Sequence, residues 1–409
     1  MIDMPSMVKE RFIRRVQAVE AEEENGVCMD LDFTWEQQEF RYQVARFAKE
    51  RIAPVAEEME GAKMPSKELI REMGELGYLG VKFPEEYGGA GVDAPHVYHC
   101  ILIEEVAKVS AGFAAAVAMT TSVPLVSIHK FGSDALRQKY LVPTIQGKMV
   151  GAFGLTETEA GSDVAGIRTR AVQDGDSYVL NGTKVFISNG TVADFIVVAA
   201  KTSPEKGMAG ISMFLVDTCM KGFKVSRPLD KFTTHSSDTA ELVFEDLVVP
   251  KENLLGDEDT GLVNLLNSLE EDRVMTAAIS LGLAKAAYEA ALKYSQEREQ
   301  FGKQISKFQA VRFRLVDMLA LLESSELYLY YAARKADKGE RVAKEAALSK
   351  IIVCEAANKV CAMALSILGG YGLMTEFPVE RYLRDSYFPL IGGGTPDIMR
   401  VVVAREIGI

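Results

Sequence analysis

The sequence predicts an α+β fold in which a β domain separates two helical domains. Apolar residues recur at helical spacing up to about residue 150, for example at Phe40, Val44 and Phe47. The period then changes to two, and β-branched and aromatic residues alternate between turn residues up to about residue 260. From Gly261 the helical period returns and continues to the end. Because no βαβ alternation is present, a doubly wound sheet is not expected.

These changes of period divide the chain into four segments. We expect an N-terminal extension over residues 1–33, a helical domain over 34–150, a β domain over 151–260 and a helical bundle over 261–409. The extension carries charges of both signs, so it fits neither a secretory signal nor a transit peptide, and we interpret it as an extra helix or arm. Inside the β domain, Asn181-Gly182 between two apolar runs predicts a hairpin turn.

Composition limits the classes of partner. The 409 residues carry a net charge of −12, and the pI is near 5.1, which argues against nucleic acid as the main partner. No apolar run approaches 18 residues, so no membrane span is expected.

Cysteine and histidine give no indication of a metal site. The five cysteines are scattered without a CxxC pair, which fits a reducing, cytoplasmic compartment. Cys354 and Cys361 lie seven apart in a helical run and are expected to be core thiols. His96 and His99 in "HVYHC" lack further ligands nearby, so a plain helical surface is the expectation there.

Two polar clusters could bind a ligand. The segment "GLTETEAGSD", 154–163, offers small residues and hydroxyls that can wrap a polar group, although a plain polar loop has the same composition. The segment "REQFGKQISKFQ", 298–309, places basic residues and a glycine between two helices, which suits a phosphate. A solvated loop at a helix end is the alternative.

Five motifs, in order, resemble the flavin-dependent acyl-CoA dehydrogenases. They are "LTETEAGSD", "KVFISNG", "SSDTAELVFEDLVVPKENLLG", "REQFGKQISKFQ" and "ILGGYGLMTEFPVERYLRD", and the resemblance spans residues from about 34 to 409. It implies an N-terminal all-α domain, a middle β-barrel-like domain and a C-terminal four-helix bundle. It also implies FAD in a cleft between the domains, a homotetramer built as a dimer of dimers, and electron-transfer flavoprotein as the redox partner.

The resemblance assigns residues to the cofactor. The loop that meets the flavin ring and the ligand would contain Phe153, Leu155, Thr156 and Ser162. Phe186 stands where the family often has a Trp that packs on the flavin, and Ser188 stands where a Thr usually bonds the ring.

Further residues would hold the rest of the cofactor. Arg298, Phe301 and Gln309 resemble residues that reach the FAD of a neighbouring subunit, and Gly369 and Gly370 would let the backbone approach the pyrophosphate. Thr395 is retained. The chain departs from the family at Ser366, where Gln is usual, and at Pro396-Asp397, where Ala-Gln or a similar pair is usual.

The family reaction needs a base for the proton α to the thioester carbonyl, while the β-hydrogen leaves as hydride to the flavin N5. Many members supply a Glu from a sequence like "YEGT". The aligned residues here are Gly392, Gly393, Gly394 and Thr395, so Gly393 takes the place of that Glu and cannot act as a base.

Some branches with Gly at this position, which resemble isovaleryl-CoA and long-chain acyl-CoA dehydrogenases, supply a Glu just before an Arg on the helix that opens the last domain. The matching pair here is Asp272-Arg273 in "SLEEDRVMTAA". Helical spacing also places Asp272 on one face with Leu265 and Leu269. A buried carboxylate there is costly unless it is paired or used. Capping or ion pairing within the bundle is the alternative, and Glu271 and Asp93 are weaker candidates for the base.

The resemblance predicts an FAD-dependent acyl-CoA dehydrogenase, with Ser162, Arg273 and Gly393 near the substrate. The room left at Gly393 suggests a branched, cyclic or otherwise bulky acyl group, and a long chain is also open. Small residues in "AGFAAAVAMTTS" fit a roomy pocket or tight helix packing equally well. A non-redox lyase or desulfinase on the same fold, and a flavin- or acyl-CoA-binding protein without turnover, are the alternatives.

Overall fold

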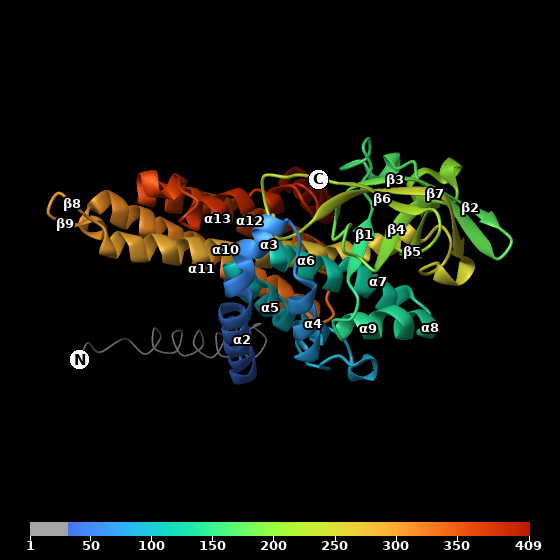
Figure 1. The fold of residues 1–409 in the computed structure, drawn as a ribbon, viewed down its shortest axis with the longest axis horizontal. Helices are drawn as coiled ribbons and strands as arrows, with labels where there is room; N and C mark the ends of the chain where they lie inside the picture. The colour runs from blue at the N-terminus through green and yellow to red at the C-terminus, as the bar shows by residue number, and fades with distance from the viewer. Residues whose placement is uncertain (1–31) are drawn as a thin grey trace, which may run out of the picture. The chain divides into compact units, whose positions relative to one another are not determined.

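The computed structural model describes residues 32–409, except for the side chains of Val263, Leu266, Asn267 and Glu271. Residues Trp35–Ile409 form one compact unit. The predicted N-terminal extension therefore lies almost entirely outside the described residues. The predicted order of helices, then a sheet, then helices is confirmed (Figure 1).

The helices of the first region pack around one buried helix. Its helices are α2 (Trp35–Phe47), α3 (Ala56–Ala62), α4 (Lys67–Glu75), α5 (Pro95–Val109), α6 (Ala111–Thr121), α7 (Val123–Phe131), α8 (Asp134–Leu136) and α9 (Val142–Ile145). Serine side chains cap several of them, as where Ser110 accepts the backbone N–H of Phe113 at the start of α6. Helix α6 is buried on nearly every side, which is typical of a helix in the middle of a domain.

One histidine differs from its expected environment. His99 was expected on a helix surface, but it is buried, and its Nε2 hydrogen bonds with Thr121 Oγ1 at 2.8 Å. The ring thus joins α5 to α6, because a buried polar ring needs a partner. Among the described residues, no group of three or more His, Cys, Asp or Glu side chains could hold a metal ion.

The β domain is one seven-stranded sheet. Its strands are β1 (Gly151–Gly154), β2 (Arg170–Asp174), β3 (Ser177–Ser188), β4 (Phe195–Lys201), β5 (Ile211–Asp217), β6 (Phe223–Pro228) and β7 (Thr239–Pro250). The hydrogen-bonded order is β1-β4-β2-β3-β7-β6, and β5 also pairs with β4. Strand β4 is buried on both faces, because one face lies in the sheet's own core and the other packs against α7 and its neighbours. The sheet and the first helices are therefore fixed to each other.

The Asn181-Gly182 hairpin prediction is wrong. The pair lies inside β3, which pairs with β7 on both sides of it, and the register shifts between Leu180 and Gly182. Asn181 instead exchanges hydrogen bonds with Asp246 on β7, at 2.9 Å and 3.1 Å. The Asn-Gly preference for unusual backbone angles is used here for a β-bulge, and the β2–β3 turn falls earlier, at Gly175 with φ of 58°.

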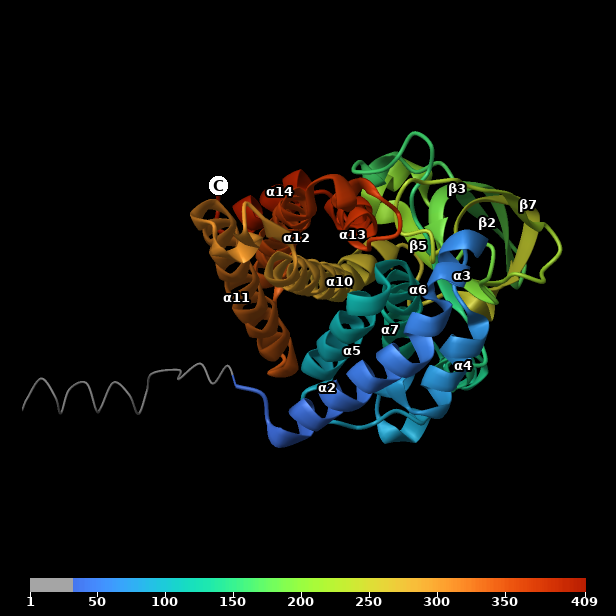
Figure 2. The ribbon, with the colours of Figure 1, turned by 60° about the vertical axis from the view of Figure 1, so that its left-hand side comes forward.

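The C-terminal region is built around the longest helix. It contains α10 (Gly261–Glu297), the short hairpin β8 (Glu299–Gln300) and β9 (Lys303–Gln304), α11 (Gln309–Asp337), α12 (Ala343–Leu368), α13 (Val379–Asp385) and α14 (Pro396–Glu406). Helix α10 packs against α11, α12 and α5 (Figure 2). Both Cys354 and Cys361 are buried, as predicted.

Two helical stretches are long and apolar enough to cross a membrane by length and composition: Ala111–Phe131 and Ala343–Leu373. Neither stretch is an unbroken apolar run, because Thr120, Thr121 and Ser122 interrupt the first, and Lys350 and Glu355 interrupt the second. In the fold, 94% of the first window and 50% of the second are buried. The first stretch is thus a core element of the folded domain.

The crossing of α10 over α5 depends on Gly282. A Cβ atom there would stand 2.1 Å from the carbonyl oxygen of Glu104 and 3.0 Å from the Cβ of Ala107. We expect Gly282→Ala to lower the thermal unfolding midpoint of the FAD-loaded protein, because overpacking costs about 1–3 kcal/mol.

Gly61 in α3 is the matched control. Nothing lies within 4 Å of its Cβ position, so Gly61→Ala should raise the midpoint, since removing a helical glycine gains about 0.5–1 kcal/mol. A rise for both variants would contradict the tight crossing.

Candidate active site

Asp272 and Gly393 face each other across the start of the helical bundle. A Cβ atom on Gly393 would stand 2.7 Å from Asp272 Oδ2 and 3.2 Å from Thr276 Oγ1. Gly393 is exposed, whereas Leu265, on the Asp272 face of α10, is fully buried. The carboxylate predicted as the base thus adjoins the place where the aligned Glu side chain would begin.

Two hydroxyl groups lie beside the carboxylate, and each makes a shorter hydrogen bond to a backbone carbonyl. Ser122 Oγ lies 2.6 Å from the carbonyl oxygen of Ala118 and 3.4 Å from Asp272 Oδ1. Because a hydroxyl has one proton, the shorter bond leaves little for the carboxylate. Thr276 Oγ1 donates to the backbone carbonyl of Asp272 at 2.8 Å. The carboxylate oxygens therefore keep capacity to accept a proton from a substrate.

Lys350 is a member of this site that the sequence analysis missed. Its side chain is fully buried on α12, and its Nζ stands 3.5 Å from the same Cβ position of Gly393. The ammonium donates to the carbonyl oxygens of Gly392 and Gly394. A lone lysine inside the apolar run "AALSKIIV" was the available indication, because an unpaired buried ammonium is costly.

Burial and the neighbouring charges shift the pKa values of Asp272 and Lys350 in opposite directions. Burial raises the pKa of Asp272, while the charges of Lys350 and Arg273 lower it again. Burial lowers the pKa of Lys350, and the carboxylate of Asp272 counteracts that shift. A carboxylate with opposing influences of this kind is typical of a functional site.

The other acids are less suitable. Glu270 lies two residues before Asp272, on another face of α10, where Arg273 and Arg341 oppose the rise in its pKa caused by burial. The side chain of Glu271 is outside the described residues. Asp93 lies in the loop before α5, where its charge acts on Tyr98 of α5. The alternative that Asp272 caps a helix is wrong, because it lies well inside α10.

The predicted flavin loop is held by β3. Val185 donates its backbone N–H to the carbonyl of Thr156 at 2.9 Å. The buried ammonium of Lys184 bonds the carbonyl of Leu155 at 2.9 Å and the carboxylate of Glu157 at 2.7 Å. Phe153, Leu155 and Ser188 are half-buried, and Ser162 is exposed.

Phe186 holds an exposed aromatic ring in an unusual backbone conformation. It has a positive φ of 62° and is 68% exposed, a conformation that costs an L-residue about 1–2 kcal/mol. An aromatic ring held out at such a cost, beside a loop with free hydroxyl groups, fits the stacking face of a flavin ring.

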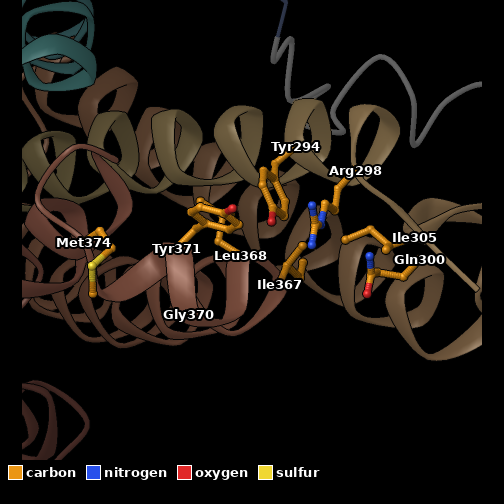
Figure 3. Close-up of a pocket in the computed structure, with 9 residues that line it drawn as sticks. All are labelled: Tyr294, Arg298, Gln300, Ile305, Ile367, Leu368, Gly370, Tyr371 and Met374. Atoms are coloured by element: carbon orange, nitrogen blue, oxygen red, sulfur yellow. The ribbon is translucent and has the colours of Figure 1, made fainter.

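A second group of predicted cofactor residues lies at the far end of the bundle. Arg298 caps α10 and lies over the ring of Tyr371, with 5.7 Å from guanidinium carbon to ring centroid. These two residues, with Tyr294 and Gly370, line a pocket of about 430 Å³ (Figure 3). Gly370 and its neighbour Gly369 have open space at their Cβ positions, so a ligand can approach the backbone.

The two sets of predicted cofactor residues lie too far apart to contact the same flavin ring within one chain. At 1.5 Å per residue, Asp272 and Arg298 stand about 39 Å apart along α10. Phe301, beside Arg298, is 93% exposed with a positive φ of 53°, and Gln309 is exposed at the start of α11. Thr395 belongs instead to the glycine segment, where its hydroxyl caps α14 by accepting the N–H of Ile398 at 3.3 Å.

Family models match almost all of the described chain. The acyl-CoA dehydrogenase N-terminal domain matches residues 34–148, the middle domain matches 152–247 and the C-terminal domain matches 259–408.

Individual relatives agree. The chain is 40% identical over 380 residues to a probable acyl-CoA dehydrogenase, YngJ, of Bacillus subtilis, covering 93% of this chain and 100% of the relative. The structure of butyryl-CoA dehydrogenase from Megasphaera elsdenii superposes with a TM-score of 0.91 at 38% identity, covering 93% of this chain and 100% of that one. A chain from a study of the electron transferring flavoprotein of Acidaminococcus fermentans gives 0.90 at 42% identity, covering 93% and 99%. The chain therefore belongs to the acyl-CoA dehydrogenase family of FAD-dependent oxidoreductases.

Proposed function

We propose that this enzyme oxidises an acyl-CoA thioester to the α,β-unsaturated product, with Asp272 as the base that removes the α-proton. The observation that carries the proposal is the contact between the Asp272 carboxylate and the exposed backbone of Gly393. When FAD is bound, its ring supplies the acceptor for the hydride that leaves the β-carbon. Phe186, Thr156 and Ser188 would hold that ring.

The chain itself supplies the base and its surroundings. Asp272 accepts a proton only in its ionised form, and the positive charges of Lys350 and Arg273 favour that form against burial. Leu265 and Leu269 line the same face of α10 and limit the access of water. Arg273, itself buried beside the base, is the substrate-side residue that the family match suggests.

Gly393 does not by itself indicate a substrate that is bulky near Cα. The space at its Cβ position is already taken by Asp272 Oδ2 at 2.7 Å and Thr276 Oγ1 at 3.2 Å. The small residues of α6 do not indicate such a substrate either. A Cβ atom on Gly112 would stand 3.0 Å from the backbone nitrogen of Ser236, so close helix packing accounts for that glycine.

A homo-oligomer and an electron acceptor complete the proposal. Arg298, Phe301 and Gln309 would contact the cofactor of a neighbouring subunit, which the separation of about 39 Å along α10 supports. Electron-transfer flavoprotein is the proposed acceptor of the electrons. A cytoplasmic location fits the free cysteines, of which Cys100, Cys354 and Cys361 are buried.

The first test is anaerobic mixing of the FAD-loaded protein with acyl-CoA thioesters while the flavin absorption band is followed. Bleaching is expected for the dehydrogenase. Asp272→Asn should slow bleaching by about 10²- to 10⁴-fold, the usual contribution of a general base, while FAD and thioester still bind.

Asp93→Asn is the matched control, because it removes a carboxylate outside the site, and its bleaching rate should match the unmodified protein. Thioester consumption with the flavin oxidised throughout would instead indicate the lyase. An unimpaired Asp272→Asn variant would remove the base assignment.

The rate of flavin reduction should fall as the pH is lowered through the pKa of Asp272. Burial raises that pKa, so the loss should begin at a higher pH than for an exposed carboxyl group. Stopped-flow reduction measured across acidic pH checks this. A flat profile down to pH values where exposed carboxyl groups protonate would contradict it.

Gly393→Ala should reduce the rate of flavin bleaching by about tenfold or more. Gly393 has a positive φ of 66°, and the new methyl group would press on the Asp272 carboxylate. A carboxylate displaced in this way loses its alignment with the α-proton, and a misplacement of about 1 Å can cost about 100-fold in rate.

Gly392→Ala is the control for that change. Its Cβ would meet the ring of Phe388 at 3.1 Å and would not approach Asp272. A smaller loss is expected, and equal losses in both variants would argue against a specific contact at Gly393.

A further inference from the structure

Lys350 is a cation enclosed by the protein interior. Its side chain is fully buried on α12, where Ser349, Val353 and Cys354 are also buried. Two of its three ammonium protons are directed at the carbonyl oxygens of Gly392 and Gly394. Neutral carbonyl groups solvate the charge but do not cancel it, so its field acts on what lies nearby.

The glycine segment curls around this ammonium. Gly393 and Gly394 have positive φ values of 66° and 93°. This left-handed backbone allows the carbonyl groups before and after Gly393 to reach the same nitrogen atom, which few L-residues could accommodate. Lys350 therefore fixes the shape of the backbone that borders the base.

The ammonium and the carboxylate both lie close to the Cβ position of Gly393. The Cβ position of Gly393 is 3.5 Å from Lys350 Nζ and 2.7 Å from Asp272 Oδ2. The two charged atoms are thus separated by at most about 6 Å, a range at which an opposite charge favours ionisation of a carboxyl group.

We propose that Lys350 is a positioning residue for the reaction: its ammonium shapes the glycine turn that receives the acyl group and provides the positive charge that faces Asp272. This inference rests on the proposed role of Asp272 as the base and adds a residue through which that base is controlled.

Other groups also face Asp272. Arg273 is its neighbour on α10, Ser122 approaches from the junction of α6 and α7, and Lys82 acts from the segment after Tyr78–Gly80. Lys350 is the charge with the largest opposing influence on the pKa of Asp272, ahead of Arg273. Arg273 also interacts with Glu270, whose charge raises the pKa of Arg273 more than that of Asp272 does.

The test compares the pH dependence of flavin reduction in three FAD-loaded proteins: the unmodified chain, Lys350→Met and Lys350→Gln. Methionine removes both the charge and the hydrogen bonds to the glycine turn. Glutamine removes the charge but keeps an amide that can donate to a carbonyl. If the charge acts on Asp272, the acidic limb should move to higher pH by about 1–3 units in both variants.

Lys285→Met is the matched control. Lys285 is a mostly buried lysine on the same helix as the base, but it pairs with Glu104 and Glu326, at 2.8 Å and 2.7 Å. Its loss should lower the unfolding temperature without moving the acidic limb. An equal shift in this control would mean that the limb reports general loosening and would overturn the inference.

A direct readout does not depend on any substitution of Lys350. In the unmodified FAD-loaded protein with ¹³C-labelled aspartate, difference infrared spectra against Asp272→Asn identify the Asp272 carboxyl group. A carboxylate band at neutral pH is expected. A protonated carboxyl band at neutral pH would overturn the inference, even if neither Lys350 variant folds.

The failures are distinguishable. If Asp272→Asn reduces its flavin at the normal rate, the proposed base falls, and this inference falls with it. If Asp272→Asn is inactive but Lys350→Met and Lys350→Gln both hold FAD and keep the acidic limb within about 0.3 units, below the shift that a charge at this range produces, only the role of Lys350 is rejected.

Discussion

The site depends on the approach of a carboxylate to a backbone that has no side chain. The Cβ position of Gly393 is 2.7 Å from Asp272 Oδ2, which is closer than a real Cβ and an oxygen can approach. A residue with a side chain at 393 and a carboxylate at 272 in this conformation therefore exclude each other. Gly393 cannot act as a base itself, and its lack of a side chain leaves the space that the proposed base, Asp272, occupies.

This approach requires that three separate elements keep their places. Asp272 is carried by α10, the glycine turn by the segment before α14, and the ammonium of Lys350 by α12. The position of α10 is set partly by its crossing with α5, where Gly282 leaves no room for a methyl group beside the carbonyl of Glu104. Close-packed interiors transmit displacements, so a shift of α10 at this crossing would also shift the Asp272 carboxylate.

Local patterns in the sequence were sufficient for the order of domains and for the face of α10 that carries Asp272, because both depend on residues close together in the chain. They were insufficient where the partner is distant. Asn181-Gly182 forms a bulge rather than a turn, since Asp246 on β7 offers Asn181 its hydrogen bonds. His99 is buried because Thr121 on the next helix bonds its ring. The hydrogen-bond partners of Lys350 are carbonyl groups more than 40 residues away in the sequence, so local patterns could not reveal them.

Contacts with residues distant in the chain also explain why three glycines follow one another here. A single glycine at 393 would make room for Asp272, but the turn must also direct two carbonyl groups at one buried ammonium. That demands left-handed backbone at both Gly393 and Gly394. Gly392 meets the Phe388 ring at 3.1 Å from its Cβ position, so it too is constrained by packing. Each glycine is thus required by a different contact: Gly392 by the Phe388 ring, Gly393 by the Asp272 carboxylate, and Gly394 by the turn of the backbone toward Lys350.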